Sequence, residues 1–118
     1  MKIVEKNEGT KIEYDLKKTR LSFADGALTI DLQRYQQDDD VVRDIMVDSE
    51  GYLTTGKGRY FVAQVEIPAR QYEETVLPAA ETEEGEQNKQ EQVERKPLPL
   101  NTDDVTLYLF AIDGIMIR

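Results

Sequence analysis

The feature that most constrains the fold is a two-residue alternation of apolar and polar side chains, which recurs along most of the chain. It is strongest over residues 59–67 (RYFVAQVEI), where one face carries Phe61, Ala63, Val65 and Ile67. Successive side chains of a β-strand point to opposite faces, so this period predicts strands rather than helices. The first half of the segment is apolar on both sides, which predicts that both of its faces are covered.

Shorter segments with the same alternation predict further strands. Turns that contain glycine separate them, such as Asp25-Gly26, which supplies the positive φ angle that a tight β-turn needs. Residues 32–40 lack the alternation and predict a loop or a short helix. The segments expected as strands are residues 11–16, 20–23, 27–32, 41–48, 52–55, 59–67, 69–77 and 105–112, followed by a short hairpin arm at 115–118.

These segments predict a mainly β fold of about seven to nine antiparallel strands, arranged as a small barrel or a two-layer sandwich with a long acidic loop. A chain of 118 residues suits a single domain, so residues 1–118 are expected to share one core. The side chains expected in that core are Ile30, Phe61, Val65, Leu107 and Leu109.

One segment is acidic and almost without apolar side chains. Residues 73–94 contain eight Glu and one Lys, a net charge of -7, whereas the other 96 residues carry only -2. Such a composition buries too little apolar surface to offset the entropy of ordering. We therefore expect residues 78–100 to form a disordered acidic insertion. A binding loop is the first alternative, and a helix interrupted by Gly85 is the second.

The overall composition excludes several functional classes. The chain has no Cys and no His, so disulfides, thiolate metal sites, Cys nucleophiles and His-based triads are all excluded. Its 24 acidic residues against 15 basic ones argue against binding to nucleic acid or to an anionic membrane. The first residues, MKIVEKNEGTK, lack the apolar core of a secretory signal, so we expect a cytoplasmic protein.

Few residues suggest catalysis or metal binding. The acidic run 38–40, with Asp44 nearby, does not have the ligand spacing of an EF-hand and is interpreted as a solvated loop, so no metal or cofactor is expected. The turn at 56–58 (GKG) lacks the frame of a phosphate loop. Ser22 and Ser49 are the only serines and have no His to activate them. We expect no enzymatic activity; a hydrolase that uses paired carboxylates is the alternative.

Tyrosine and arginine residues form a candidate interface. Four of them flank the proline break after the strongest strand, and one lies in the segment 32–40: Arg59, Tyr60, Arg70 and Tyr72, with Tyr35. Protein interfaces are enriched in both residue types. In the alternative interpretation, the tyrosine rings cap the core and the arginines balance nearby glutamates.

The order of several sequence segments resembles that in a group of small uncharacterised proteins encoded in prophage or phage-like regions of Gram-positive bacteria. The resemblance covers most of the chain. It is carried by residues 12–23 (IEYDLKKTRLSF), 60–74 (YFVAQVEIPARQYEE), 95–100 (RKPLPL) and 104–109 (DVTLYL). That group has no established activity, so the resemblance implies a phage-associated context and no functional residues.

The composition, the β pattern and this resemblance lead to one functional hypothesis. It is a non-enzymatic structural or assembly module of a phage or prophage that binds protein, either itself as a homo-oligomer or a phage structural component. It would reside in the cytoplasm of the bacterial host or in a virion. The alternative is a β module that binds a small ligand or a carbohydrate through Tyr35, Tyr60 and Tyr72.

Overall fold

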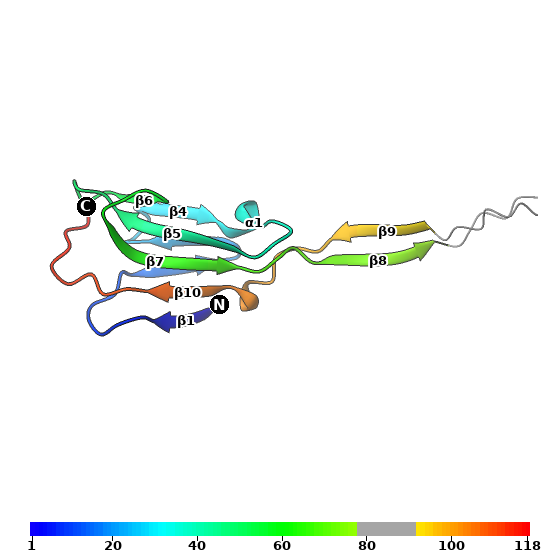
Figure 1. Cartoon of the computed structure of the whole chain (residues 1–118), viewed down its shortest axis with the longest axis horizontal. Helices are drawn as coiled ribbons and strands as arrows, with labels where there is room; N and C mark the ends of the chain where they lie inside the picture. Colours follow the sequence, from blue (N-terminus) through cyan, green and yellow to red (C-terminus); the bar gives the residue numbers. More distant parts are fainter. Residues whose placement is uncertain (78–91) are drawn as a thin grey trace, which may run out of the picture.

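The computed structural model describes residues 1–77 and 92–118, which form two packed β-sheets and one projecting hairpin (Figure 1). The five-stranded sheet has the order β1-β10-β7-β5-β6, the three-stranded sheet has the order β2-β3-β4, and β8 pairs with β9 alone. The strands are β1 (Lys2–Glu5), β2 (Tyr14–Lys17), β3 (Arg20–Phe23), β4 (Leu28–Asp31), β5 (Val41–Val47), β6 (Leu53–Thr55), β7 (Tyr60–Ile67), β8 (Tyr72–Leu77), β9 (Gln92–Pro97) and β10 (Thr106–Leu109).

The predicted mainly β fold is confirmed, and its architecture resembles the sandwich rather than the barrel. No sheet in the described part of the chain closes on itself, and the described residues form ten strands instead of the expected seven to nine. Neighbouring strands are antiparallel except β1, which runs parallel to β10. The expected loop or short helix at 32–40 contains α1 (Leu32–Tyr35), and a 3₁₀ turn, η1 (Thr102–Asp104), precedes β10.

The core lies between the two larger sheets. The three-stranded sheet contributes Leu21, Phe23 and Ile30, and the five-stranded sheet contributes residues such as Val65 and Leu107. These side chains lie on alternate positions of their strands, as the two-residue period requires. Four of the five predicted core residues are therefore buried.

Phe61 is the exception, because its side chain is 44% exposed. The register between β5 and β7 shifts: Ile45 lies opposite Ala63, whereas Met46 lies opposite Phe61, so Val62 is an extra residue on β7. A β-bulge of this kind changes which face is taken by the side chains on its N-terminal side, here Phe61. Val62 is fully buried as a result, and Phe61 leaves the core.

The alternation of apolar and polar residues does not predict two of the observed strands, β1 and β9. β1 has no buried residue, so its sequence carries no apolar face. β9 lies inside the segment 78–100 that was expected to be disordered. Residues 78–91 of that segment lie outside the described residues, but Gln92–Pro97 pairs with β8 and corrects the prediction there.

The predicted strand at the C-terminus is wrong. Residues 115–118 form no strand; instead the Ile115 amide closes a turn onto the Ile112 carbonyl at 2.9 Å. The Arg118 amide then donates to the Gly51 carbonyl at 2.8 Å, so this segment is anchored to the turn before β6. None of the helices in the described ranges is long and apolar enough to cross a membrane.

Candidate interface on the projecting hairpin

The hairpin of β8 and β9, called the arm below, extends away from the end of the sandwich (Figure 1). Its register runs from Tyr72 opposite Pro97 to Leu77 opposite Gln92. Six residues at ~3.4 Å each give an arm of about 20 Å. A two-stranded ribbon alone is marginally stable in water, so other contacts must hold the arm in place.

Complementary charges fix the register of the arm. Glu73 lies opposite Lys96, and Glu74 lies opposite Arg95, with 3.4 Å between Glu74 Oε1 and Arg95 Nε. The Arg95 guanidinium also lies 4.4 Å from the centre of the Tyr72 ring. Opposite charges facing each other across a strand pair contribute about 0.2–1 kcal/mol, and a slip of one residue would lose them.

The outer part of the arm exposes an apolar pair. Val76 and Val93 lie opposite each other and are 56% and 53% exposed. Alternate residues of a strand share a face, so the valines lie on the same face as Tyr72 and Arg95. That face therefore combines an exposed apolar pair with a tyrosine and an arginine, and the last two residue types are enriched in protein interfaces.

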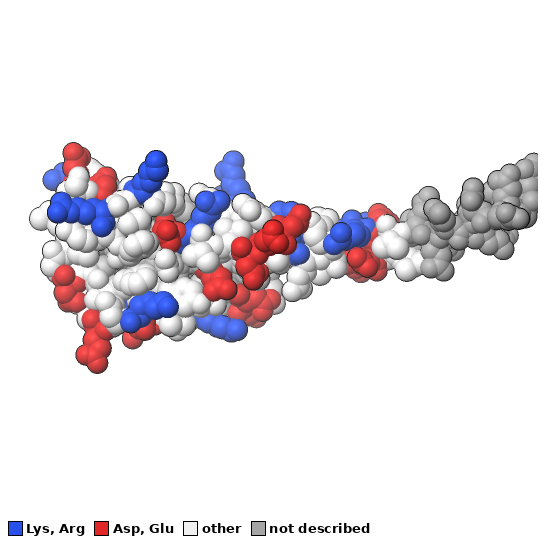
Figure 2. Space-filling view, viewed as in Figure 1, with Lys and Arg blue, Asp and Glu red and all other residues white. Residues whose placement is uncertain are grey.

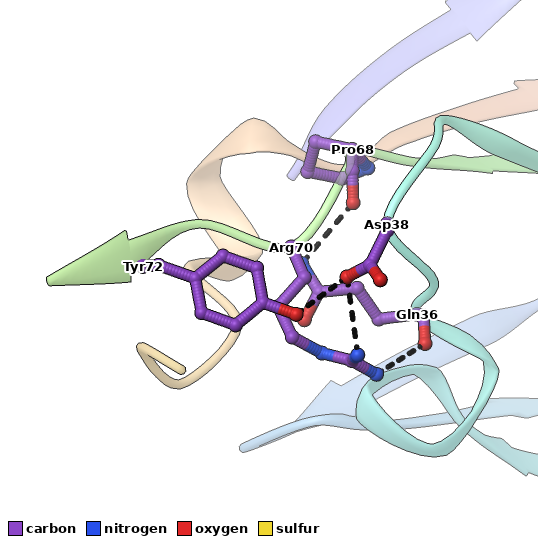
Figure 3. A network of polar contacts seen from close by, with 5 residues as sticks. All are labelled: Gln36, Asp38, Pro68, Arg70 and Tyr72. Carbon is purple, nitrogen blue, oxygen red and sulfur yellow. Dashed lines mark hydrogen bonds and ion pairs between the residues drawn. The ribbon is translucent and has the colours of Figure 1, made fainter. Parts of the chain in front are cut away.

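A polar network anchors the base of the arm to the loop after α1 (Figure 3). The Tyr72 hydroxyl donates to Asp38 Oδ1 at 2.6 Å, and Arg70 Nη1 lies 3.3 Å from the same oxygen. Arg70 Nη2 donates to the Gln36 carbonyl at 2.8 Å. The Gln36 side chain is only 6% exposed, and its Nε2 donates to the Pro68 carbonyl at 3.1 Å.

Backbone bonds reinforce this network. The Arg70 amide donates to the Gln37 carbonyl at 2.7 Å, and the Ala69 amide donates to Asp40 Oδ1 at 2.8 Å. The neighbouring Tyr72 side chain raises the pKa of Arg70 above its ordinary value, with a smaller contribution from the Asp38 carboxylate. Bonds from both the chain entering the arm and β8 itself fix the direction in which the arm projects.

The structure brings together two of the five residues predicted as an interface. Arg70 and Tyr72 share Asp38 at the base of the arm. Tyr35 contacts neither of them through a polar bond: its ring packs against the Arg43 guanidinium, 4.8 Å from the ring centre. Tyr35 is half-buried there, so the interpretation of a ring that caps the core suits this residue best.

Arg59 and Tyr60 lie at the far end of the sandwich. Tyr60 begins β7, and the eight residues of that strand separate it from the arm by about 25 Å. Its ring faces the Arg59 guanidinium at 5.4 Å and lines an open hollow of about 570 Å³ together with Glu50 and Arg118. The predicted residues thus belong to three separate places.

Sequence patterns did not identify Gln36, Asp38, Val76 or Val93 as site residues. Asp38 is 34 positions from its partner Tyr72, and no local pattern reveals such a contact. The arm did leave a signal, since EE at 73–74 and RK at 95–96 are complementary when aligned antiparallel. That signal was hidden by the acidic composition around it.

The acidic residues between positions 38 and 44 accept hydrogen bonds in different parts of the structure. Asp38 and Asp40 bind the base of the arm, whereas Asp44 accepts a hydrogen bond from Gln64 at 2.9 Å. Among the described residues, no three acidic side chains gather in a way that could hold a metal ion.

The outer face of the five-stranded sheet is a second exposed surface. Figure 2 shows a largely uncharged area over this sheet and acidic side chains gathered where the arm leaves the sandwich. Phe61 and Phe110 pack together there, with 5.9 Å between ring centres. The Tyr108 hydroxyl donates to Glu66 at 2.9 Å, so these polar groups satisfy each other on the face.

Comparison of the chain with protein-family models, curated proteins and solved structures found no match.

Proposed function

We propose that this chain is a non-enzymatic module that binds protein and serves in assembly, with the arm as its main binding element. The observation that carries the proposal is a ribbon about 20 Å long that is anchored at its base and projects from the sandwich. A rigid base limits the entropy lost when the arm is bound. The exposed Val76–Val93 pair supplies apolar surface to be buried.

The proposal places the module in a phage or prophage, as the resemblance of its sequence implies. In that setting it acts in the bacterial cytoplasm or within the virion, and a small β module with a projecting arm would link neighbouring structural proteins. Genes for tail or capsid proteins beside its own gene would support this context. A neighbourhood of metabolic genes would contradict it.

Binding through the arm can be tested by photo-crosslinking in the cells that produce the protein. A photo-reactive amino acid replaces Val76, and a matched variant carries it at Tyr52, which is 49% exposed on the sandwich. We expect a discrete protein adduct from position 76 and much less from position 52. Equal or absent crosslinking at position 76 would contradict the proposed role of the arm.

One observation favours the alternative of a small-ligand or carbohydrate-binding module. Tyr60 lines the hollow of about 570 Å³ at the end of the sandwich opposite the arm. Arg59 lies over the Tyr60 ring, however, where a sugar would have to stack. Titration with oligosaccharides, compared between wild type and Tyr60→Ala, tests this alternative, and loss of binding in the variant would support it.

A further inference from the structure

The three-stranded sheet carries a concentration of positive charge at the end where α1 lies. Around the β2–β3 turn and on α1, four cationic side chains are exposed, here called the basic patch: Lys17, Lys18, Arg20 and Arg34. Lys17 Nζ lies 3.9 Å from Asp15 Oδ2, and both side chains are largely exposed, so this contact leaves Lys17 open to a further partner. The Leu32 amide donates to the Thr19 carbonyl at 2.8 Å, which holds α1 against this turn.

The strands of the arm carry a small negative charge. β8 and β9 together contain Glu73, Glu74 and Glu94 against Arg95 and Lys96, a net charge of -1. In β8 itself, Glu74 is paired with Arg95 at 3.4 Å. Glu73 forms no ion pair among the described residues, because Lys96, which lies opposite it, contacts Glu94 at 3.8 Å. The unpaired Glu73 carboxylate of the arm is therefore complementary in charge to the basic patch.

Both surfaces also offer a free strand edge. β2 is the outer strand of the three-stranded sheet, and β8 is one of the two strands of the arm, so one edge of each pairs with no strand in the described part of the chain. Every residue of β2 except Leu16 is exposed. Unpaired N–H and C=O groups on such edges favour the addition of another strand.

An antiparallel alignment of β8 on β2 matches the two strands at both ends. It places Glu73 opposite Lys17 and Val76 opposite Tyr14. Both pairs form at once because Glu73 and Val76 are three residues apart in β8, and Tyr14 and Lys17 are three residues apart in β2. The Tyr14 side chain is 40% exposed and lines a hollow of about 300 Å³ beside β2. The alignment thus joins an ion pair at one end to an apolar contact at the other.

We propose that the partner of the arm is a second copy of this chain, whose β2 edge receives β8. This inference rests on the proposed function of the arm. The arm points away from its own sandwich (Figure 1), so it cannot lie along its own β2. The two surfaces differ, so each copy both gives an arm and receives one, which generates a ring or an open filament.

The contact is weak between two isolated copies. Four paired residues bury far less than the ~800 Å² per partner of a standard stable interface. Association should therefore increase with protein concentration and decrease with salt, which screens the exposed charges. Closure into a ring compensates, since every copy of a closed ring makes two such contacts.

Charge reversal tests the pairing of the arm with the patch. Sedimentation velocity at low salt compares wild type with Lys17→Glu, Glu73→Lys and the control Lys57→Glu, which makes the same change on an exposed turn away from β2. We expect each of the first two variants to need a concentration about tenfold higher to associate. An equimolar mixture of those two should recover association, because the reversed charge on the arm of one copy then faces the reversed charge on the patch of the other. Association unchanged by either reversal would overturn the proposal, as would a wild type that stays monomeric at millimolar concentration.

A crosslink tests the register, and the chain has no native cysteine to interfere. The alignment places Asp15 opposite Thr75, at a separation that suits a disulfide. Mixed Asp15→Cys and Thr75→Cys proteins should form a disulfide-linked dimer on oxidation, whereas Ser49→Cys mixed with Thr75→Cys should not. Equal yields from the two mixtures would overturn the proposal. If position 76 then photo-crosslinks to a different protein, the arm still binds protein; if it crosslinks to nothing, the proposed function fails as well.

Discussion

The sandwich and the arm are both made of paired antiparallel strands, yet they are stabilised in different ways. In the sandwich, each strand pair also packs against the opposite sheet, so residues such as Leu21 and Leu107 are completely buried. In the arm, strand pairing has no opposite layer, and even the apolar pair Val76–Val93 stays more than half exposed. Both regions consist of hydrogen-bonded strand pairs, but burial of apolar area supplies most of the stability only in the sandwich.

The contrast also concerns anchorage. The arm keeps its direction through a few polar contacts at Asp38 and Arg70, whereas the sheets of the sandwich share an apolar core. Variants that separate apolar packing from polar anchorage therefore test the comparison directly.

The largest difference is expected between core and arm truncations. Leu107→Ala should lower the free energy of unfolding by about 2–5 kcal/mol, because it leaves a cavity between the sheets. Val76→Ala, which removes a similar kind of side chain from the arm, should change it by less than about 0.5 kcal/mol. Urea denaturation measures both, and equal effects would show that the arm packs as a core element.

Loss of the anchor should loosen the arm without unfolding the sandwich. Asp38→Ala removes the acceptor of the Tyr72 hydroxyl and the ionic partner of Arg70. For such exposed groups, the free energy needed to detach the arm from the loop should fall by about 1 kcal/mol. Amide hydrogen exchange of β8 and β9 should then become about fivefold faster, with β7 unaffected.

Asp39→Ala is the matched control for this measurement, since Asp39 is also exposed and adjacent in sequence. Faster exchange in both variants would show that the acidic loop as a whole, rather than the Asp38 contacts, holds the arm.

Removing most of the arm should have a smaller effect on the sandwich. Residues 75–94 can be replaced by Asn-Gly, because Glu74 and Arg95 are cross-strand partners that a tight turn can join. The melting temperature should change by no more than about 3 °C, since the deleted side chains that the structure describes, at 75–76 and 93–94, are all exposed. Thermal denaturation followed by circular dichroism measures this, and a much larger decrease would mean that the arm supports the core.

The smallest expected effect is a pH dependence within the sandwich. Asp113 Oδ2 accepts a hydrogen bond from the Thr10 amide at 2.9 Å, and this bond lowers the pKa of Asp113 below its ordinary value. A lowered folded-state pKa stabilises the fold above the unfolded pKa of ~3.9, and that contribution is lost as the pH falls through the folded value. Asp113→Asn should therefore lower the melting temperature at pH 6, with a deficit that shrinks below about pH 4. A deficit that is constant with pH would contradict this origin.

Much of the fold could be predicted because its signal is local. The alternation along β3, β4, β5 and β7 follows from which side chains a half-buried strand can expose. The errors have physical reasons. Phe61 was placed in the core because a bulge at Val62 cannot be seen in the period itself. β9 was missed because its stability depends on pairing with β8 and not on apolar residues of its own.

The candidate site was predictable only in part. Arg70 and Tyr72 were identified from residue type and from their place after the proline break. Their partners Gln36 and Asp38 lie more than 30 positions away, joined to them only when the loop after α1 folds against the strand exit. Tyr60 has the residue type that a site residue would have, yet β7 carries it to the opposite end of the sandwich.

The sequence by itself determined that this chain forms β-sheets around an apolar core, and that it does so without cysteine or histidine chemistry, because alternation and composition act locally. It also determined that the negative charge is concentrated in one segment. Only the tertiary structure decided that the two ends of this segment pair into a projecting arm, that Asp38 anchors it, and that a basic patch lies on another sheet. Those arrangements depend on contacts between residues far apart in the chain, which exist only after the sheets have packed.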